Sequence, residues 1–465
     1  MLFRSPPPEA DDFDLSHDAL ANDLGARSWD HNARFVATWG QWLFWSGRHW
    51  QRDVTRQDYA RTRLYLGTRA RELQGWAETR AEEHRAAGED KAADKMMAWA
   101  KAEARALRNK VTVAAVESLA QSNTASAARA ELFDADLRLL GTPGGTVDLR
   151  TGQVRAARRE NYITRLTAVG PAVGQPVRWL AFLEEIFQGD RELIAFMQRA
   201  AGYSLTGLTT EHKFLFCEGG GRNGKGTFLE TLFYILGDYG RRIAASALLK
   251  SKVERHPTDL AGLRGARFVV GSELPRGVSW DEAAIKDMTG GDVLTARHMR
   301  QDFFDFRPQF TLWIAGNTQP SFKGVDEALR SRVVLVPFNV TIPAERRDQE
   351  LPMKLREEAG RILTWAIEGA VEWHRRGLDV PASVAAVSKE YMDAEDTLGQ
   401  FLADETEAEP LGFVGSTELY QRFCQWAQAR GLGVWALNTF AKEIRSRLTP
   451  GRRGRANGYS GLRLR

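Results

Sequence analysis

The chain has 465 residues, of which 43% are hydrophobic and 27% are charged, a composition typical of ordinary globular proteins. This length is too great for one hydrophobic core, so we expect roughly two to four domains. No uncharged apolar run approaches about 18 residues, so no transmembrane helix and no membrane partner are expected, and the two cysteines exclude a disulfide framework or a cysteine-ligated zinc site.

The first part of the chain is expected to be a disordered start followed by a largely helical domain. Residues 1–12 carry three consecutive prolines and lack the apolar core of a signal peptide, which favours a cytoplasmic protein. Residues 61–107 show apolar side chains at helical intervals, and residues 139–149 are turn-rich with short β segments. We assign residues 13–175 to this helical domain with short β segments.

An aromatic cluster within this domain surrounds a Ser-Gly turn and predicts a short hairpin. Its members are Trp39, Trp42, Phe44, Trp45 and Trp50. Such a cluster could stack nucleic-acid bases. Clusters of this kind are more often part of a hydrophobic core, and we favour that interpretation.

Residues 176–375 are predicted to form an α/β domain on a parallel sheet. Residues 181–201 have the apolar spacing of one amphipathic helix. Four short, nearly continuous apolar runs follow, at residues 214–217, 268–270, 310–315 and 333–336. Runs of this kind suit strands buried on both faces of a parallel sheet, and the intervening segments are long enough for crossover helices.

The end of the chain is predicted to be a basic domain. Residues 376–410 are expected to be a helical connector that ends in an acidic linker, residues 404–410. In residues 411–465, two helix candidates and a Gly- and Arg-rich hairpin follow in the order of a winged-helix domain. From Lys442 onward there are eight basic side chains and one acidic one, a net charge of +7. That concentration predicts binding to nucleic-acid phosphates, by Lys442, Arg445, Arg452, Arg453 and Arg455. The alternative is a tail that only aids solubility.

The strand candidate at residues 214–217 runs into a Gly-rich loop and then an apolar helix. Gly219, Gly224 and Lys225 match the G-x-x-x-x-G-K pattern in the strand–loop–helix context that a phosphate loop requires. Backbone N–H groups of such a loop form a nest for phosphate oxygens, and the lysine adds a positive charge. The expected nucleotide-binding residues are Gly219, Gly220, Gly221, Arg222, Asn223, Gly224, Lys225, Gly226, Thr227 and Phe228. The residue after the lysine is glycine, so the hydroxyl that binds Mg²⁺ is expected from Thr227.

Two later strands end in polar residues suited to nucleotide hydrolysis. Glu273 could activate the attacking water, with Thr227, Ser272 and Glu273 near the metal. A glutamate at the end of a strand is common, and only the spacing of Glu273 after the phosphate loop strengthens its assignment to hydrolysis. Asn317 could hold the water or contact the outer phosphate, although an isolated Asn at this position more often only forms a turn.

Arg330 and Arg332 precede the last strand candidate and could reach a neighbouring subunit's phosphates. The alternative is a salt bridge to a local acid such as Asp326.

Between the second and third of these strands lies a basic, aromatic segment. Residues 297–306 are predicted to form a hairpin whose tip carries Arg297, His298 and Arg300, preceded by Lys286 in a Lys-x-x-Thr-Gly-Gly-Asp sequence. A tip of this kind could grip a nucleic-acid backbone by charge and stacking. An ordinary surface hairpin with its phenylalanines in the core is an equal alternative.

The order of these motifs resembles the phage and plasmid primase–helicase family of superfamily 3, which is related to the poxvirus primase–helicase. The resemblance rests on Gly-Arg-Asn-Gly-Lys-Gly-Thr, Ser-Glu, Thr-Gly-Gly-Asp, Gly-Asn-Thr and Val-Pro-Phe, and extends to residues 141–152. It implies an AAA+-like ATPase core over residues 176–375 behind a collar domain. It also implies a homo-oligomeric, usually hexameric, ring on single-stranded DNA.

The resemblance further implies that ATP and Mg²⁺ bind between subunits. Lys225, Glu273 and Asn317 would come from one subunit and Arg332 from its neighbour, with Arg330 as a competing candidate. Members often carry an N-terminal primase domain; none is expected in this chain, so a separate primase or polymerase would be a partner.

We therefore predict an ATP-dependent DNA helicase for replication of a phage, prophage or plasmid in the bacterial cytoplasm, acting on single-stranded and fork or origin duplex DNA. The first alternative is an ATP-switched origin-binding or helicase-loading protein without sustained unwinding. The second is an RNA-directed motor.

Overall fold

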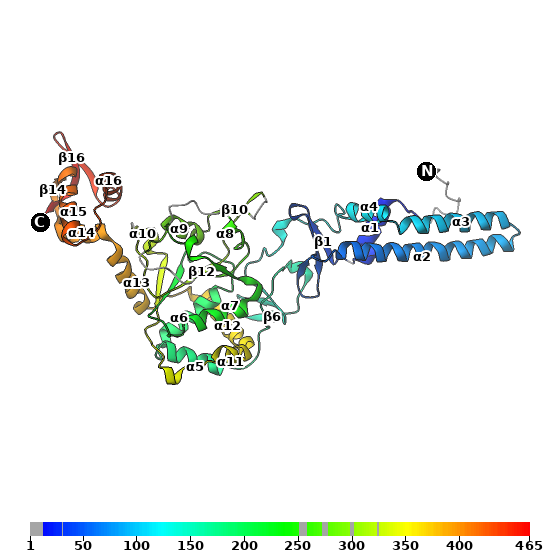
Figure 1. Cartoon of the computed structure of the whole chain (residues 1–465), viewed down its shortest axis with the longest axis horizontal. Helices are drawn as coiled ribbons and strands as arrows, with labels where there is room; N and C mark the ends of the chain where they lie inside the picture. The colour runs from blue at the N-terminus through cyan, green and yellow to red at the C-terminus, as the bar shows by residue number, and fades with distance from the viewer. Residues whose placement is uncertain (1–12, 30, 251–257, 272–277, 298–301, 323–324) are drawn as a thin grey trace. The chain divides into compact units, whose positions relative to one another are not determined.

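The computed structural model describes residues 13–29, 31–250, 258–271, 278–297, 302–322 and 325–465. The chain divides into two compact units (Figure 1). Unit 1 comprises residues 1–147 and 154–166, and unit 2 comprises residues 148–153 and 167–465. Within the described ranges, no helix has both the length and the apolarity needed to cross a membrane.

Unit 1 contains a small antiparallel sheet packed against helices. Its strands are β1 (Ala33–Val36), β2 (Gln41–Trp45) and β3 (Trp50–Arg52), and its helices are α1 (His17–Asp23), α2 (Gln57–Ala86), α3 (Asp90–Leu107) and α4 (Lys110–Ala120). Successive side chains in a strand point to opposite faces. Trp42 and Phe44 therefore join the core against the helices, whereas Leu43 and Trp50 join a second core with Phe133. The core interpretation of the aromatic cluster is confirmed for Trp42, Phe44 and Trp50.

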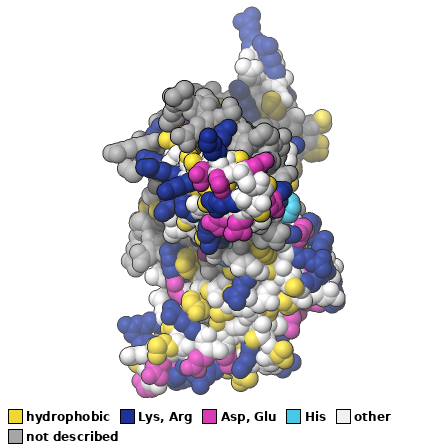
Figure 2. Space-filling model, turned by 90° about the vertical axis from the view of Figure 1, so that its right-hand side faces the viewer, with side chains coloured by type: hydrophobic (Ala, Val, Ile, Leu, Met, Phe, Trp, Pro, Cys, Tyr) yellow, Lys and Arg dark blue, Asp and Glu magenta, His cyan; other side chains and the backbone are white. Residues whose placement is uncertain are grey.

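Helices α2 and α3 form a long antiparallel hairpin in unit 1. The 30 residues of α2 span about 45 Å at 1.5 Å per residue. Leu73, Ala77, Met96 and Trp99 are buried along the seam between the two helices. Ion pairs such as Arg80–Glu83 lie on its outside, and Figure 2 shows Lys, Arg, Asp and Glu side chains interspersed at this end. A second small sheet in the chain contains β4 (Leu139–Thr142), β5 (Gly145–Asp148) and β6 (Gln153–Arg155).

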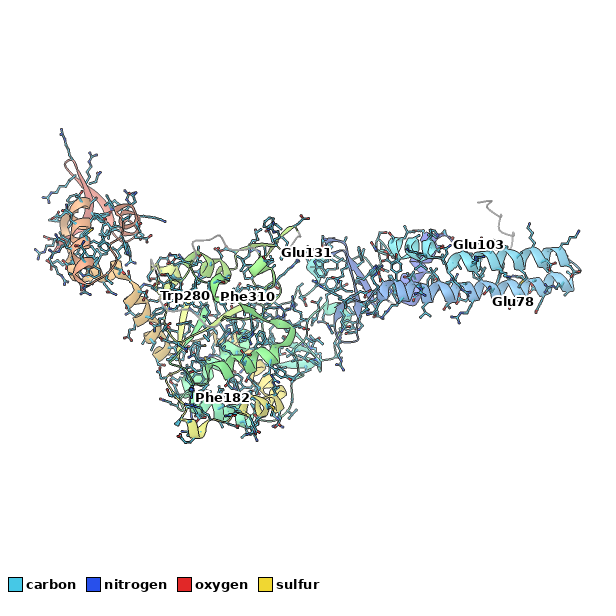
Figure 3. All side chains as sticks on the ribbon, viewed as in Figure 1. Glu78, Glu103, Glu131, Phe182, Trp280 and Phe310 are labelled. Atoms are coloured by element: carbon cyan, nitrogen blue, oxygen red, sulfur yellow. The ribbon has the colours of Figure 1, made fainter. Side chains whose placement is uncertain are left out.

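Unit 2 is built on a five-stranded parallel sheet, as the apolar runs predicted. The strand order is β13 (Val333–Pro337), β7 (Phe214–Glu218), β12 (Thr311–Gly316), β9 (Phe268–Gly271) and β8 (Gly240–Ile243). Strand β7 thus lies between β12 and β13, the last two strands of this sheet in the sequence. The core on one face includes Trp280, whose ring lies 5.8 Å from Phe214 and 5.7 Å from Phe216, and Phe310 (Figure 3).

The helix expected at residues 181–201 is two helices, so that prediction was wrong. Helix α5 (Val177–Ile186) ends where Gln188 and Gly189 adopt positive φ values of 54° and 74°. Asp190 then caps α6 (Arg191–Tyr203), accepting a hydrogen bond from the Leu193 N–H at 3.0 Å.

Helix α6 packs closely on α12 (Ala359–Arg376) through two glycines. A Cβ at Gly202 would lie 2.0 Å from the backbone N of Ala370, and one at Gly369 would lie 2.0 Å from the Gln198 carbonyl oxygen. The two backbones can approach this closely only without those side chains. Nearby, the Trp179 ring stacks on Phe228 of α7 (Lys225–Leu236) at 5.3 Å and meets Trp365 at 5.4 Å.

Further elements of unit 2 surround the sheet. They are α8 (Thr258–Ala261), α9 (Glu282–Gly290), α10 (Glu327–Arg330), α11 (Leu351–Glu357), α13 (Ala382–Glu395) and the antiparallel pair β10 (Leu294–Arg297) and β11 (Phe303–Phe306). In that pair Phe306 is buried, as expected for a surface hairpin with its phenylalanines in the core, whereas Phe303 is 59% exposed.

The C-terminal part of unit 2 has a core of its own. Its elements are α14 (Thr397–Glu405), β14 (Thr406–Gly415), α15 (Ser416–Ala429), α16 (Leu437–Ile444), β15 (Thr449–Arg453) and β16 (Ala456–Leu464). We call residues 397–465 the C-terminal domain. Its sheet has the order β14-β16-β15.

The expected acidic linker at residues 404–410 is wrong. These residues end α14 and form the start of β14, which pairs with β16. Arg463 of β16 forms ion pairs with Glu407 and Glu409 of β14. Leu398 and Phe401 are buried in the core of the C-terminal domain, which therefore begins near residue 397.

Candidate nucleotide-binding site

The loop between β7 and α7 depends on glycine at two positions. Gly224 has φ +86°, and a Cβ there would lie 2.4 Å from Cγ2 of Ile186. At Gly219, an added Cβ would lie 2.4 Å from the Phe338 carbonyl oxygen. Gly221 and Arg222 also have positive φ values, of 94° and 53°. The loop therefore turns tightly, and its backbone N–H groups are left near the N-terminus of α7, which favours anions.

Lys225 is the first residue of α7 and is only 6% exposed. Its ammonium donates hydrogen bonds to the Gly219 carbonyl oxygen at 2.5 Å and to Oδ1 of Asn317 at 3.3 Å. Burial lowers the pKa of Lys225, while the neighbouring Cys217 and Glu218 oppose that shift. The side chain thus brings a positive charge into a pocket of backbone and amide oxygens.

The structure brings Lys225 and Asn317 together because their strands are neighbours. Asn317 directly follows β12, and Gly316 of β12 is paired with Glu218 of β7. Parallel strands end on the same side of a sheet, and ligands in open α/β sheets bind outside these ends. Strand β9 ends at Gly271 beside Ile314 of β12. Ser272 and Glu273, which follow, lie outside the described residues.

Asn223 holds the loop in place, a role that sequence reasoning did not assign to it. Its side chain is buried, and Nδ2 donates to the Phe338 carbonyl oxygen at 3.0 Å, while Oδ1 accepts from the Lys225 N–H at 3.5 Å. Sequence reasoning also missed Glu218 and Gln319, whose side chains are joined by a 2.7 Å hydrogen bond. In the sequence, only the position of Glu218 directly before Gly219 indicates that this pair lies beside the loop.

The metal-binding prediction rests on few described groups. Thr227 is half-buried in the first turn of α7, and Gly226 is exposed with no heavy atom within 4 Å of an added Cβ. Over the ranges that the structure describes, no group of three or more His, Cys, Asp or Glu side chains could hold a metal ion. The remaining predicted ligands, Ser272 and Glu273, are not among those residues.

The two candidate arginines lie at the opposite end of the sheet from Lys225. Both precede β13, whose first residue Val333 pairs with Phe214, the first residue of β7. A five-residue strand is about 17 Å long. These arginines are therefore too far away to contact a phosphate held by Lys225 of the same chain.

Arg330 and Arg332 differ in their partners. Arg330 forms ion pairs with Asp393 at 2.6 Å and Asp396 at 2.8 Å. Arg332 donates to the Ala328 carbonyl oxygen at 2.7 Å, and its buried Nε has no hydrogen-bond partner among the described residues. Arg330 thus forms salt bridges to nearby acids, the alternative considered from the sequence, although the acids are Asp393 and Asp396 and not Asp326.

The predicted nucleic-acid contacts fall at two places. Lys286 forms an ion pair with Asp326, and the Arg297 guanidinium lies 4.8 Å from the centre of the Phe303 ring. His298 and Arg300 lie outside the described residues. In the C-terminal domain the five predicted side chains are all exposed, at or after the end of α16 and along the β15–β16 hairpin: Lys442, Arg445, Arg452, Arg453 and Arg455.

Comparison with known proteins adds two family models and several viral relatives. Residues 24–188 match the model described as "D5 N terminal like", and residues 217–332 match a family of unknown function (DUF5906). "Putative helicase L207/L206" of Acanthamoeba polyphaga mimivirus is 24% identical over 54% of this chain and 28% of its own length. "Putative helicase 022R" of Frog virus 3 is 25% identical over 55% of this chain and 28% of its own length.

Among solved structures, the apo structure of the NrS-1 C-terminal region is similar at 13% identity. The match covers 63% of this chain and 77% of that one, with a TM-score of 0.41, which is too low to establish a shared fold. The chain spans little more than a quarter of the length of the two viral relatives. At low identity, then, the chain is similar over about half its length to viral proteins named as putative helicases.

Proposed function

We propose that this chain is an ATP-dependent DNA helicase of superfamily 3 with an AAA+-like core over residues 176–375. The observation that carries the proposal is the buried Lys225, placed at the start of α7 and within 3.3 Å of Asn317 from the neighbouring strand. A lysine, backbone N–H groups at the N-terminus of a helix and a strand-end amide are groups suited to phosphate transfer. The donor set at the loop therefore fits the phosphates of ATP.

In this proposal each residue has one task. Backbone N–H groups of the loop and of the first turn of α7 bind phosphate oxygens, apart from those of Gly219, Gly221 and Phe228, which donate to backbone carbonyl oxygens. Lys225 exchanges its contacts with Gly219 and Asn317 for the outer phosphates. Thr227 supplies a hydroxyl for Mg²⁺, with Ser272 and Glu273 nearby. Bound Mg²⁺ supplies positive charge to the phosphate oxygens. Glu273 accepts a proton from the attacking water, and Asn317 orients that water.

We further propose a ring of identical subunits, hexameric by resemblance, and the position of Arg332 supports it. Since Arg332 lies at the far end of the sheet from Lys225, it can complete a site only on another copy. We assign the trans role to Arg332 rather than Arg330, because Arg330 is held by two carboxylates.

DNA would be bound in two ways. The β10–β11 hairpin, with Lys286, Arg297, His298 and Arg300, would contact single-stranded DNA. The C-terminal domain would bind fork or origin duplex as a winged-helix module through Lys442, Arg445, Arg452, Arg453 and Arg455. Two parts of the proposal stay predictions: a separate primase or polymerase as partner, and replication of a phage or plasmid in a bacterial cell. The relatives described above come from Acanthamoeba polyphaga mimivirus and Frog virus 3, which are not bacterial viruses.

The first test measures ATP turnover and fork unwinding with and without single-stranded DNA. Lys225→Ala should abolish turnover while leaving assembly intact. The matched control is Lys354→Ala, which removes a lysine that only pairs with Asp348 and Glu350 on the surface. Wild-type turnover in Lys225→Ala would refute the assignment of the loop, and equal loss in both variants would show a general effect on folding.

The second test asks whether Arg332 acts on a neighbouring subunit. Lys225→Ala and Arg332→Ala should each be inactive alone. A mixture should recover part of the turnover, because some interfaces then combine an intact lysine with an intact arginine. A mixture that stays inactive, although mixed oligomers form, would contradict the trans assignment.

Gly226 favours a second candidate, an ATP-switched origin-binding or loading protein. A glycine after the lysine removes the usual hydroxyl for Mg²⁺, and hydrolysis is the step most sensitive to that loss. Tight ATP binding without DNA-stimulated turnover would support this candidate. Stimulation by RNA but not by DNA would instead support an RNA-directed motor.

A further inference from the structure

Asp396 lies buried between α13 and α14, where its side chain is 9% exposed. Its carboxylate accepts hydrogen bonds from Arg330 at 2.8 Å and from Arg447 at 2.7 Å. It also accepts the Gly399 N–H at 2.9 Å and so caps α14. One buried carboxylate is thus shared by two arginines from distant parts of the sequence.

The surroundings of Asp396 are fitted to this contact. A Cβ at Gly399 would lie 2.4 Å from Oδ2 of Asp396 and 3.1 Å from Nη1 of Arg447, so any other residue there would displace the Asp396 carboxylate from its present position. Burial raises the pKa of Asp396, but the hydrogen bonds from Arg447, Gly399 and Arg330 outweigh that effect and lower it. The carboxylate is therefore charged at neutral pH and pairs with both guanidinium groups.

The two arginines belong to segments with different proposed tasks. Arg447 follows α16 in the C-terminal domain and precedes the β15–β16 hairpin that carries the exposed arginines. Its second nitrogen donates to the Val325 carbonyl oxygen at 2.7 Å. Arg330 ends α10, two residues before Arg332. Arg447 and Asp396 therefore connect the C-terminal domain to Val325 and Arg330, which lie shortly before Arg332.

We propose that Asp396 is a positioning residue that couples duplex binding by the C-terminal domain to the placement of Arg332. The proposal rests on the proposed function, in which Arg332 acts on a neighbouring subunit's nucleotide. A buried ion network changes as a unit, since removal of one partner leaves the other charges unpaired. A shift of Arg447 when the hairpin binds duplex would thus pass through Asp396 to Arg330 and the residues after it.

The test compares Arg447→Gln with Arg430→Gln in the full-length chain. Arg430 forms a 2.8 Å ion pair with Asp404 within the C-terminal domain and does not contact Asp396, so it is the matched control. Basal turnover, affinity for a fork duplex and stimulation of turnover by that duplex are measured for each. We expect Arg447→Gln to keep basal turnover and duplex affinity but to lose stimulation by at least about fivefold, the low end of typical coupling between sites.

A second variant and a second readout separate coupling from simple loss of structure. Gly399→Ala should separate Asp396 from Arg447 without touching the basic hairpin, and should lose stimulation in the same way. ADP affinity, measured with and without duplex, reports the same coupling when no turnover occurs. A wild-type chain without turnover would contradict the proposed function, whereas full stimulation or unchanged ADP–duplex coupling in Arg447→Gln would overturn the role of Asp396.

Discussion

Gly224→Ala should destabilise the sheet domain of unit 2, and the structure gives the size of the effect. At φ +86°, alanine pays about 1–2 kcal/mol for the left-handed backbone. The new Cβ would lie 2.4 Å from Cγ2 of Ile186 and 3.1 Å from the Phe182 ring, and overpacking of this kind costs about 1–3 kcal/mol. Together these give about 2–5 kcal/mol, a large part of the stability of a typical domain.

Gly226→Ala is the matched control, two residues along the chain. Its backbone is helical, and an added Cβ would meet no heavy atom within 4 Å. Alanine should therefore leave α7 unchanged or stabilise it by up to about 1 kcal/mol. The assay is hydrogen exchange of peptides that cover α7, because exchange reports this domain alone in a chain with several domains.

Protection of α7 should fall in Gly224→Ala and hold or rise in Gly226→Ala. Equal protection in Gly224→Ala and the wild type would refute the reasoning about the loop. A similar loss of protection in both variants would show that any side chain in this turn is destabilising. That result would contradict the structure, in which a Cβ at Gly226 meets no heavy atom within 4 Å.

Three further predictions concern other polar groups. Tyr391→Phe should cost about 1–3 kcal/mol of unfolding free energy in denaturant titrations, since the Trp280 N–H, which donates to the Tyr391 hydroxyl at 3.0 Å, loses its partner. Burial raises the pKa of Asp53, but backbone N–H donors, including that of Asp58, lower it overall. The stability that this carboxylate provides is present above the unfolded pKa of about 4 and is lost as the pH falls below it. In Asp53→Asn, the free energy of unfolding of unit 1 should therefore depend less on pH in the acid range. Burial raises the pKa of Cys217 to about 12, so this thiol should resist thiolate-directed labelling at pH 8 until the protein unfolds, and rapid labelling in the native state would contradict its burial.

The sheet could be predicted from the sequence where its strands are apolar on both faces. β7, β9, β12 and β13 form continuous apolar runs, and all four were expected. The edge strand β8 was not, because Arg241 and Arg242 interrupt its apolar pattern. The break between α5 and α6 was also missed, although Gly189, with a positive φ, and Asp190, which caps α6, mark it in the sequence. The apolar spacing continues across the break and hides it.

The candidate site could be predicted as a set of residues but not as a geometry. Lys225 and Asn317 are 92 positions apart, and only the placement of β12 beside β7 brings them within 3.3 Å. Strand order depends on packing of the whole sheet, which no local pattern records. For the same reason the sequence could not show that Arg330 is held by Asp393 and Asp396.

The glycine contact between α6 and α12 bears on which fragments of this chain could fold alone. These helices flank the sheet in the sequence, since α6 ends at Tyr203 and α12 begins at Ala359. A fragment limited to residues 217–332, the range of the second family model, would lack both helices and the whole of β13, and would leave Phe228 without Trp179. We therefore expect the smallest fragment that folds around the five-stranded sheet on its own to extend from before α5 to the end of α12.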